Sequence, residues 1–293
     1  MASGWRAKVL PVSLAVLGVL SILPWSILGA FEESPTLSFF ALDVGQGDAI
    51  WIETPDHYQV LIDGGPGRTI LEKLGERMHF WDREIDLVVL THPHADHVSG
   101  LLEVLRRYRV NAVIESGAEY GTAEYAEWDT LLEKNGVTQY LAVSGMKVLL
   151  GKYAELLVLA PLDSAVGKSF SNVHDANVVS ELRIGGVTFL LMGDAEAKLE
   201  RTLISEHLIS DVAVLKVGHH GSKTSSSDIF LRRAAPEIAV VSVGARNRYG
   251  HPASLVLDRL QEAGIRILRT DTMGDVVIKT DGKELSSVEF IAE

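Results

Sequence analysis

Residues 91–97 read Thr91-His92-Pro93-His94-Ala95-Asp96-His97, and this stretch decides the fold assignment of the chain. Three of the ten histidines lie within it, and a carboxylate stands between the last two. The preceding residues 85–90 are apolar and rich in β-branched side chains, which predicts a buried strand. Because Pro93 disfavours a regular continuation, we expect the histidines to lie on a loop at the end of that strand.

Imidazole and carboxylate side chains point to metal chemistry in this stretch. Neutral imidazoles and carboxylates are the ligands that borderline divalent metals prefer. A single histidine is often an ordinary core or surface residue, but a dense His/Asp cluster directly after a strand favours metal binding. The stretch therefore predicts a divalent metal site.

The composition limits the classes of protein to which the chain can belong. Its 293 residues are 47% hydrophobic and 23% charged, enough for one large domain or two modest ones. The absence of cysteine excludes disulfides, thiolate zinc sites and cysteine nucleophiles. The formal net charge of −12 argues against a protein that coats nucleic acid with a basic surface. However, residues 216–269 hold nine basic and four acidic residues, a local charge of +5 that could meet phosphates.

The N-terminal segment predicts a membrane anchor. Residues 9–30 are uncharged and long enough to cross the hydrocarbon core as one helix. Basic residues precede this segment and acidic residues follow it, which predicts a cytoplasmic N-terminus and an extracytoplasmic body. The alternatives are a cleaved signal peptide and the last span of a larger membrane architecture. We assign residues 1–30 to the anchor or signal segment, 31–36 to a linker and 37–293 to the folded domain.

Apolar residues follow a strand-like spacing in some segments and a helix-like spacing in others, which predicts a mixed α/β domain. Strands are predicted at residues 37–44, 49–53, 58–62, 85–90 and 111–115, then as short strands within 137–161 that include 155–160. Further strands are predicted at 178–184 and 187–192, as a hairpin about Gly185-Gly186, and at 212–217 and 238–243, with three short strands at the end of the chain. Helices are predicted at 70–79, 99–108, 122–134, 195–207, 227–234 and 251–263. The early hairpins favour antiparallel or mixed sheets packed between helices, and residues 167–177 predict a polar loop.

Five polar features follow predicted strands. They are Asp63-Gly64-Gly65, the 92–97 cluster, Gly193-Asp194, His219-His220 between glycines, and His251. Strand ends can converge in one cleft, where irregular backbone exposes polar groups. Asp194 is placed where a carboxylate could bridge two metal ions, although a Gly-Asp pair also makes ordinary turns.

The pair His219-His220 could supply a metal ligand, a proton donor to a leaving group or a phosphate contact, with a plain surface turn as the alternative. Ser222 and Lys223 follow in the chain and could add phosphate contacts. His251 precedes a proline and could bind metal or cap the loop. Three of the remaining histidines are interpreted as surface residues, and the role of His174, in the polar loop, stays open.

The pattern at residues 92–97 resembles the H-x-H-x-D-H signature of the metallo-β-lactamase fold superfamily. Within that superfamily, Leu42-Asp43-Val44-Gly45-Gln46-Gly47-Asp48, Leu61-Ile62-Asp63-Gly64-Gly65 and Leu215-Lys216-Val217-Gly218-His219-His220-Gly221-Ser222 resemble the extracytoplasmic hydrolase domain of the ComEC family. The resemblance spans about residues 37–293. It implies a four-layer αββα sandwich with a metal cleft at one sheet edge, behind one N-terminal transmembrane helix.

The same resemblance implies a set of site residues. One or two zinc or manganese ions are expected, the first held by His92, His94 and Asp194, and the second by Asp96, His97, Asp194 and His251. The superfamily usually offers a further histidine before the strand that leads to the bridging aspartate. In this chain Asn177 stands at that place, which predicts a weaker first metal side. Asn177, Ser222 and Lys223 are assigned to substrate binding.

The function that the resemblance implies is metal-dependent phosphodiester hydrolysis. Asp96 would orient the attacking water, and His219 or His220 would stabilise charge and protonate the leaving oxygen. The expected substrate is single-stranded DNA at the cell surface during uptake, with a separate uptake channel as a partner. The alternatives are hydrolysis of another phosphoester, such as a cell-wall phosphorylcholine-type ester, and a metal-poor domain that only binds nucleic acid.

Overall fold

The computed structural model describes residues 35–291 of the chain. The anchor predicted at residues 1–30 lies outside the described residues and stays a prediction. Within residues 35–291, no helix is long and apolar enough to cross a membrane. Residues 36–293 make up one compact unit.

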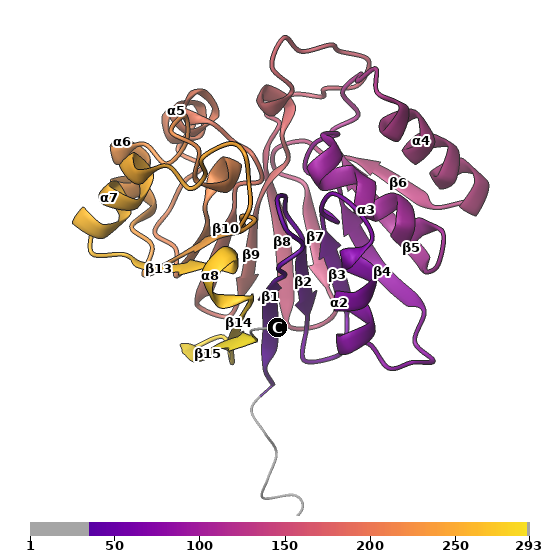
Figure 1. Ribbon diagram of the computed structural model, residues 1–293, viewed down its shortest axis with the longest axis horizontal. Coiled ribbons are helices and arrows are strands. Elements are labelled where there is room, and N and C mark those ends of the chain that lie inside the picture. Colours follow the sequence, from indigo (N-terminus) through magenta and orange to yellow (C-terminus); the bar gives the residue numbers. More distant parts are fainter. Residues whose placement is uncertain (1–34, 292–293) are drawn as a thin grey trace, which may run out of the picture. The chain divides into compact units, whose positions relative to one another are not determined.

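Two β-sheets lie at the centre of this unit (Figure 1). The eight-stranded sheet has the order β15-β14-β1-β2-β3-β4-β5-β6, and the seven-stranded sheet has the order β13-β12-β11-β10-β9-β8-β7. The strands of the first sheet are β1 Leu37–Ala41, β2 Ile50–Glu53, β3 Gln59–Ile62, β4 Glu84–Val89, β5 Arg109–Glu115, β6 Thr138–Leu141, β14 Asp275–Thr280 and β15 Leu285–Ile291. The strands of the second are β7 Lys147–Leu150, β8 Ala154–Ala160, β9 Val179–Ile184, β10 Val187–Leu191, β11 Val214–Lys216, β12 Ile238–Val241 and β13 Arg266–Arg269.

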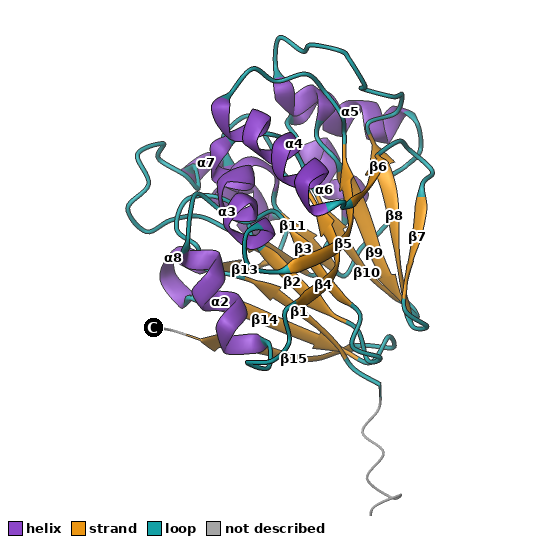
Figure 2. Cartoon of the chain, turned by 90° about the vertical axis from the view of Figure 1, so that its right-hand side faces the viewer, coloured by secondary structure: helices purple, strands orange, loops and turns teal. Residues whose placement is uncertain are grey.

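Helices cover the outer face of each sheet (Figures 1 and 2). Those on the first sheet are α2 Thr69–Arg77, α3 Ala95–Leu105 and α4 Ala123–Asn135. Those on the second are α5 Ala197–Ser205, α6 Asp228–Ala234 and α7 Ser254–Glu262. The short helices η2 Val173–Ala176, η3 Gly218–Gly221 and α8 Thr270–Met273 lie in connections.

Side-chain alternation along the strands explains the layering. In β2, Ile50 and Ile52 point into the core between the sheets, while Trp51 packs in the core beneath α2, α3 and α4. In β10, Phe189 belongs to the inter-sheet core and Leu190 to the core beneath α5, α6 and α7. Successive strand residues face opposite sides, so strands apolar on both faces need a partner on each. The four-layer αββα sandwich is therefore confirmed.

Strand direction brings the polar loops to one edge. Strands β3, β4 and β5 are parallel in the first sheet, and β10, β11 and β12 are parallel in the second. The carboxyl ends of parallel strands lie at the same edge of a sheet. Potential ligand atoms from loops of both sheets lie within 4.8 Å of one another. The predicted convergence of strand-end loops is confirmed.

The starts of two helices near the site and the content of one loop differ from the prediction. Helix α3 begins at Ala95 and not at residue 99, so Asp96 and His97 occupy its first turn instead of a loop. A carboxylate in the first turn is favoured by the helix dipole, and Pro93 lies before the N-cap, where it does not interrupt the helix. The predicted loop 167–177 contains the turn η2, and α7 begins at Ser254, three residues beyond the predicted start.

Candidate metal centre

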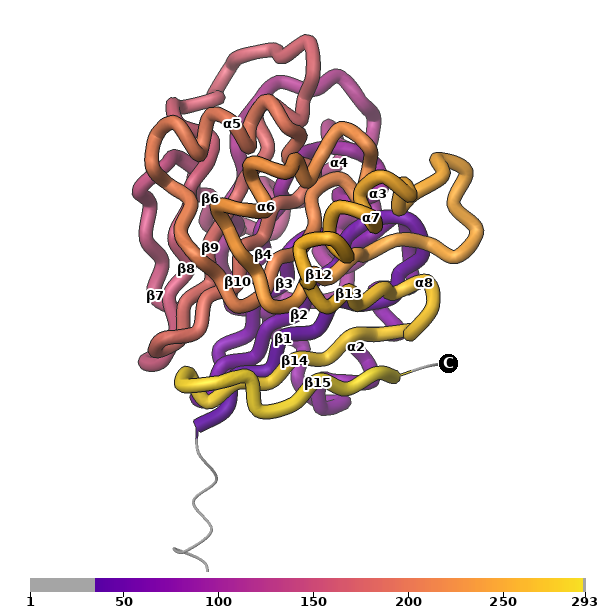
Figure 3. The backbone as a smooth tube through the Cα atoms, turned by 90° about the vertical axis from the view of Figure 1, so that its left-hand side faces the viewer, coloured from indigo at the N-terminus to yellow at the C-terminus, as the bar shows by residue number. Residues whose placement is uncertain are grey.

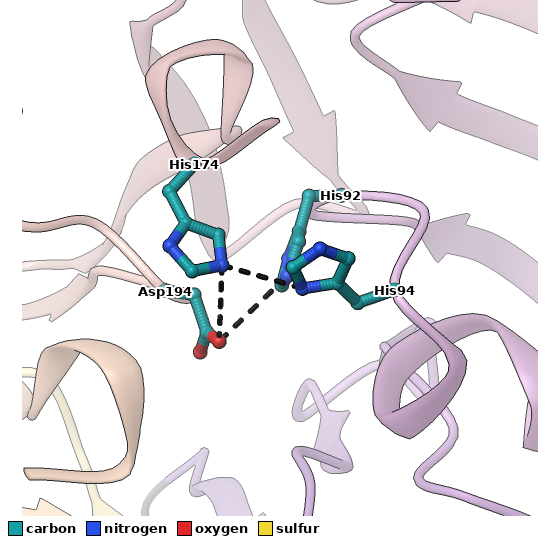
Figure 4. Close-up of side chains that lie close together, drawn as sticks. All are labelled: His92, His94, His174 and Asp194. Carbon is teal, nitrogen blue, oxygen red and sulfur yellow. Dashed lines mark hydrogen bonds and ion pairs between the residues drawn. The ribbon is translucent and has the colours of Figure 1, made fainter. Parts of the chain in front are cut away.

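The first group of potential ligands contains three histidines and one aspartate. His92, His94, His174 and Asp194 each offer an atom to a common centre (Figure 4). Nε2 of His92 lies 3.7 Å from Oδ2 of Asp194, and Nε2 of His174 lies 3.9 Å from the same oxygen. The distance between Nε2 of His174 and Nδ1 of His94 is 3.3 Å. Residues from before β9 and after β4 and β10 thus meet at one point.

The second group adjoins the first through Asp194. Asp96, His97 and His220 offer one ligand atom each within 4.8 Å of one another. Oδ1 of Asp194 lies 3.5 Å from Nε2 of His97 and 3.5 Å from Nε2 of His220. Nε2 of His220 is also 3.4 Å from Oδ2 of Asp96. The two carboxylate oxygens of Asp194 therefore face different groups.

Two properties of the ligand atoms fit divalent metal ions: their distances from one another and the lack of hydrogen-bond partners for several of them. Two ligands of one tetrahedral ion, each about 2.1 Å from it, lie about 3.4 Å apart, close to the separations found here. Buried polar atoms are nearly always hydrogen-bonded. Among the described residues, however, Nε2 of His92, His97 and His220 and Oδ1 of Asp194 are buried without a hydrogen-bond partner. A pair of ions sharing Asp194 would satisfy these atoms.

A buried network holds His97. Asp63, at the end of β3, has its Oδ2 atom 2.7 Å from Nδ1 of His97. The hydroxyl of Thr91 donates to the same oxygen at 2.7 Å, and its backbone N–H donates to Oδ1 of Asp63 at 2.8 Å. A carboxylate on the far nitrogen of a ligating histidine fixes the ring orientation and leaves Nε2 free for metal. The Asp63-Gly64-Gly65 feature therefore supports the centre without contacting an ion.

A backbone carbonyl and a second carboxylate lie behind His220, and Nδ1 of His220 is hydrogen-bonded to the carbonyl oxygen of Ser242 at 3.0 Å. Oδ1 of Asp48 lies 3.2 Å from Nδ1 of His220. The other oxygen accepts a 2.8 Å hydrogen bond from Nζ of Lys216, a lysine with no exposed surface. Asp48 and Lys216 belong to two of the sequence stretches that carry the family resemblance, and neither was expected at the site.

His174 corrects the expectation that the first side of the centre lacks a third histidine. This histidine stands three residues before Asn177, in the turn η2. Asn177 is fully buried, accepts a 3.0 Å hydrogen bond from the backbone N–H of Asp194 and donates a 2.8 Å bond to the carbonyl of Met192. The structure thus places Asn177 behind the bridging aspartate, where it orients that residue instead of facing a substrate.

His219 and Glu196 lie beside the first group. Nδ1 of His219 is 3.2 Å from Oε1 of Glu196, and its Nε2 atom is 3.8 Å from Oδ2 of Asp194. Glu196 also lies 3.7 Å from Nδ1 of His174. His219 and His220 both have left-handed backbone angles, with φ of 49° and 53°. Such angles are uncommon for non-glycine residues, and the surrounding structure has to hold these two histidines in them.

The other predicted site residues surround this centre. The ring of His251 lies 5.7 Å from that of His219, and none of the ligand groups includes it. His220 occupies the place beside Asp96 and His97 that was expected for His251, so metal binding by His251 stays a prediction. Ser222 is buried with its hydroxyl 3.0 Å from that of Thr224, and Lys223 is exposed. Their contacts to substrate also stay predictions.

Burial and charge set the protonation of the histidines. Burial lowers the pKa of His92 well below its ordinary value and that of His174 to about 4, so both are neutral at pH 7. Burial also opposes charge on His220, but the carboxylates of Asp194 and Asp48 outweigh it and raise the pKa of that residue to about 10. His220, with Nε2 3.4 Å from the carboxylate, and the charge of His97 overcome burial and lower the pKa of Asp96 to about 2. Metal binding at Nε2 of His220 would release the extra proton of that histidine.

Comparisons with known proteins agree with this geometry. ComE operon protein 3 of Bacillus subtilis is 29% identical over 255 residues, which is 80% of this chain and 32% of that protein. Competence protein ComA of Neisseria gonorrhoeae is 30% identical over 276 residues, which is 87% of this chain and 35% of that protein. The chain therefore spans about one third of the length of these relatives.

Solved structures share the fold at low sequence identity. The Zn(2+)-bound PqqB from Methylobacterium extorquens superposes with a TM-score of 0.51 at 12% identity, covering 80% of this chain and 97% of PqqB. The family model of the metallo-beta-lactamase superfamily matches residues 42–245 of this chain. The resemblance predicted from the sequence is thus confirmed. Because the match contains every residue of both ligand groups and the strands that position them, the chain belongs to the metallo-β-lactamase superfamily.

Proposed function

We propose that this chain is a metal-dependent phosphodiesterase that cleaves DNA, with single-stranded DNA as its substrate during uptake. The observation that carries the proposal is the pair of ligand groups joined by Asp194, whose oxygens face one group each. Two ions held in this way suit an in-line displacement at phosphorus. The relatives named as competence proteins favour DNA among the possible phosphodiesters.

The residues of the two groups would hold zinc or manganese, which when bound lowers the pKa of a water ligand and polarises the phosphoryl oxygens. Asp96 is the more accessible carboxylate, with 31% of its side chain exposed against 2% for Asp194. This exposure supports Asp96 in orienting the attacking water. Asp63 keeps His97 in place, and the carbonyl of Ser242 keeps His220 in place, so neither ring has to reorganise during the reaction.

Proton donation is assigned to His219. The side chain of His219 is 22% exposed, whereas that of His220 is 2% exposed and is turned to Asp96 and Asp194. Glu196 accepts from Nδ1 of His219, which leaves Nε2 as the nitrogen that faces the site. An imidazolium in this position can give its Nε2 proton to the leaving oxygen and is held in orientation by the carboxylate behind it.

Location is part of the proposal. The uncharged residues 9–30 support a single membrane anchor with the body outside the cytoplasm, and a separate channel protein would then carry the DNA inward. Alkaline extraction of membranes tests the anchor, because an integral helix stays in the membrane pellet. Release of the chain into the supernatant, without loss of its first 30 residues, would contradict the anchor.

Activity is tested on the full chain supplied with zinc or manganese. A single-stranded oligonucleotide, its duplex and a small ester such as bis(p-nitrophenyl) phosphate are compared as substrates. We expect cleavage of the single strand, a loss of two orders of magnitude or more in Asp194→Asn, and a loss of about 10²–10⁴ in His219→Gln. His79→Gln is the matched control, since His79 is exposed in the loop after α2, at the other end of the strands.

The possible outcomes separate the alternatives. Turnover of the small ester alone would reject the nuclease assignment and favour another phosphoester. Full DNA cleavage by Asp194→Asn would reject the metal-dependent mechanism. Metal-independent DNA binding without turnover of any ester would favour a domain that only binds nucleic acid.

A further inference from the structure

The loop between β12 and α7, residues 244–252, projects from the body (Figure 3). Arg246, Arg248 and Tyr249 are exposed on it, and 70% of the surface of Tyr249 is open to solvent. No acidic residue occurs from residue 238 to residue 257, in a chain whose net charge is −12. Within residues 35–291, neither arginine is paired with a carboxylate. The loop is thus a local basic surface with an aromatic side chain.

The side-chain amide of Asn247 holds loop 244–252 in a defined conformation. The amide nitrogen of Asn247 donates to the carbonyls of Gly244 and His251 at 2.9 and 2.7 Å. Its side-chain oxygen accepts from the backbone N–H groups of Tyr249 and His251 at 3.2 and 3.0 Å. One side chain therefore ties both ends of the loop together and leaves the two arginines and the tyrosine pointing outward on a preformed turn.

A continuous row of rings connects the loop to the centre. The ring of Tyr249 is stacked on that of His251, with 5.9 Å between centroids and 16° between planes. The ring of His251 lies 5.7 Å from that of His219, whose Nε2 atom is 3.8 Å from Asp194. A polymer whose scissile phosphate lies at Asp194 would have its neighbouring nucleotides close to Tyr249.

We propose that loop 244–252 is the platform that binds the single strand beside the scissile phosphate. Tyr249 stacks on an unpaired base, and Arg246 and Arg248 bind the backbone phosphates on either side. Stacking of a base on an aromatic side chain next to cationic groups is the common way to hold single strands without sequence preference. The inference rests on the proposed function and adds how this centre would select a polymer over a small ester.

Three physical points support this assignment. A protein of net charge −12 repels DNA at long range, so binding requires a local concentration of positive charge. The bases of a duplex are already stacked and paired, so an aromatic platform favours single strands. The preformed loop also loses little conformational freedom when the substrate binds.

Binding and catalysis are measured separately to test the inference. Binding of a fluorescent single-stranded oligonucleotide to the full chain is followed by anisotropy in EDTA, where hydrolysis cannot occur. We expect Tyr249→Ala to weaken binding by at least about fivefold, which is about 1 kcal/mol and the low end for loss of one stacked base. Tyr249→Phe should bind like the wild type, because the ring that stacks is retained.

The charge contribution is tested through salt. The double variant Arg246→Ala/Arg248→Ala should reduce the slope of log K against log salt by about 1.4, since each phosphate contact on a single strand contributes about 0.7. In the metal-loaded chain, these variants should raise KM for the oligonucleotide and leave hydrolysis of bis(p-nitrophenyl) phosphate within about twofold of the wild-type rate. The matched controls are Tyr153→Ala and Arg109→Ala, exposed side chains at the opposite end of the strands.

Every outcome decides for or against the platform. Equal oligonucleotide affinity in Tyr249→Ala and Tyr153→Ala would overturn it, as would an equal loss of affinity for single strand and duplex. A parallel loss of small-ester hydrolysis in Tyr249→Ala would also count against it. If the wild type hydrolyses no ester but Tyr249→Ala and the arginine variant still lose affinity, the phosphodiesterase proposal fails and the binding platform stands.

Discussion

Lys216 and Asp48 form a buried ion pair beside the candidate ligand His220. Lys216 donates to Asp48 at 2.8 Å and to the carbonyl of Val217 at 2.9 Å, so its charge is compensated inside the protein. Breaking a buried ion pair by removing one partner costs about 3–5 kcal/mol, which makes both residues necessary to the local structure. Asp48 in turn places its charge 3.2 Å from Nδ1 of His220, whose hydrogen bond to the carbonyl of Ser242 keeps Nε2 directed to the centre.

A second buried carboxylate, Glu115 at the end of β5, predicts a pH dependence of stability. Burial raises its pKa above the ordinary value of 4.5, against the hydrogen bonds that Tyr125 and Trp128 donate to it. The folded state therefore binds the proton more tightly than the unfolded state. The contribution of Glu115 to stability is greatest below pH 4.5 and falls as pH rises from 4.5 through the raised pKa of the folded state.

Glu115→Gln should remove this fall, because the amide does not ionise and its oxygen can still accept from Tyr125 and Trp128. Urea unfolding at intervals from about pH 4 to 8 measures the free energy of unfolding of both proteins. As pH rises through this window, the free energy of unfolding of the variant should increase relative to that of the wild type. A difference that is constant with pH would show that Glu115 ionises as easily in the folded chain as in the unfolded one.

At the scale of elements, the contact between α3 and the loop after β3 positions the histidine cluster. The backbone N–H of Gly64 donates to the carbonyl of His97 at 2.9 Å, and that of Gly100 donates to the carbonyl of Gly65 at 2.9 Å. A Cβ atom at residue 100 would overlap the carbonyl oxygen of Gly64. The close approach lets Asp63 reach His97, so the glycine within the helix serves the site.

Gly100→Ala should therefore force α3 away from this loop. We expect a loss of about 1–3 kcal/mol in the free energy of unfolding and a weaker affinity for metal, because the contact between Asp63 and His97 would lengthen. Urea unfolding and metal titration by calorimetry measure the two effects.

Gly75→Ala in α2 is the matched control. A Cβ atom at that position meets nothing within 4 Å, so the substitution should stabilise the chain by about 0.4–1 kcal/mol and leave metal affinity unchanged. Equal behaviour of the two alanine variants would mean that the approach of α3 to Gly64 does not constrain the site.

At the scale of the whole domain, the centre joins the two sheets. His92, His94, Asp96 and His97 follow β4 of the first sheet, whereas Asp194 and His220 follow β10 and β11 of the second. A metal bound here connects the two halves of the sandwich. Any ligand that binds only the folded state stabilises it. The gain is about 2.7 kcal/mol when the free ligand concentration is one hundred times the dissociation constant.

Zinc or manganese at that concentration should raise the melting temperature of the EDTA-treated chain by about 5–10 °C, since 1 kcal/mol shifts Tm by about 2–4 °C for a domain of this size class. Differential scanning calorimetry with and without metal measures the shift. Asp194→Asn should lose most of it, because Asp194 serves both ligand groups.

Asp211→Asn provides the comparison, since the side chain of Asp211 is 84% exposed and precedes β11, whereas His220 follows the opposite end of that strand. This variant should keep the full metal-dependent shift. A shift of the same size in Asp194→Asn would mean that the metal stabilises the chain from another site.

Local pattern predicts much of this architecture. The apolar runs placed the strands of both sheets to within a few residues, and the hairpin around Gly185-Gly186 joins β9 to β10 as expected. The start of α3 was misplaced because the ligand cluster and the first helical turn overlap at Ala95. When the same residues form a ligand cluster and the first turn of a helix, residue types alone do not show where the loop ends and the helix begins.

The sequence by itself determined the superfamily, and it predicted the H-x-H-x-D-H half of the candidate centre and Asp194, because these depend on residues close together or directly after a strand. Only the tertiary structure decided that His174 replaces the expected histidine at the place of Asn177, and that His220 stands beside Asp96 and His97. Those pairings join loops about 80 to 125 residues apart in the chain. The lengths of connecting loops and the packing of two sheets bring them together, and neither can be read from the spacing of residues.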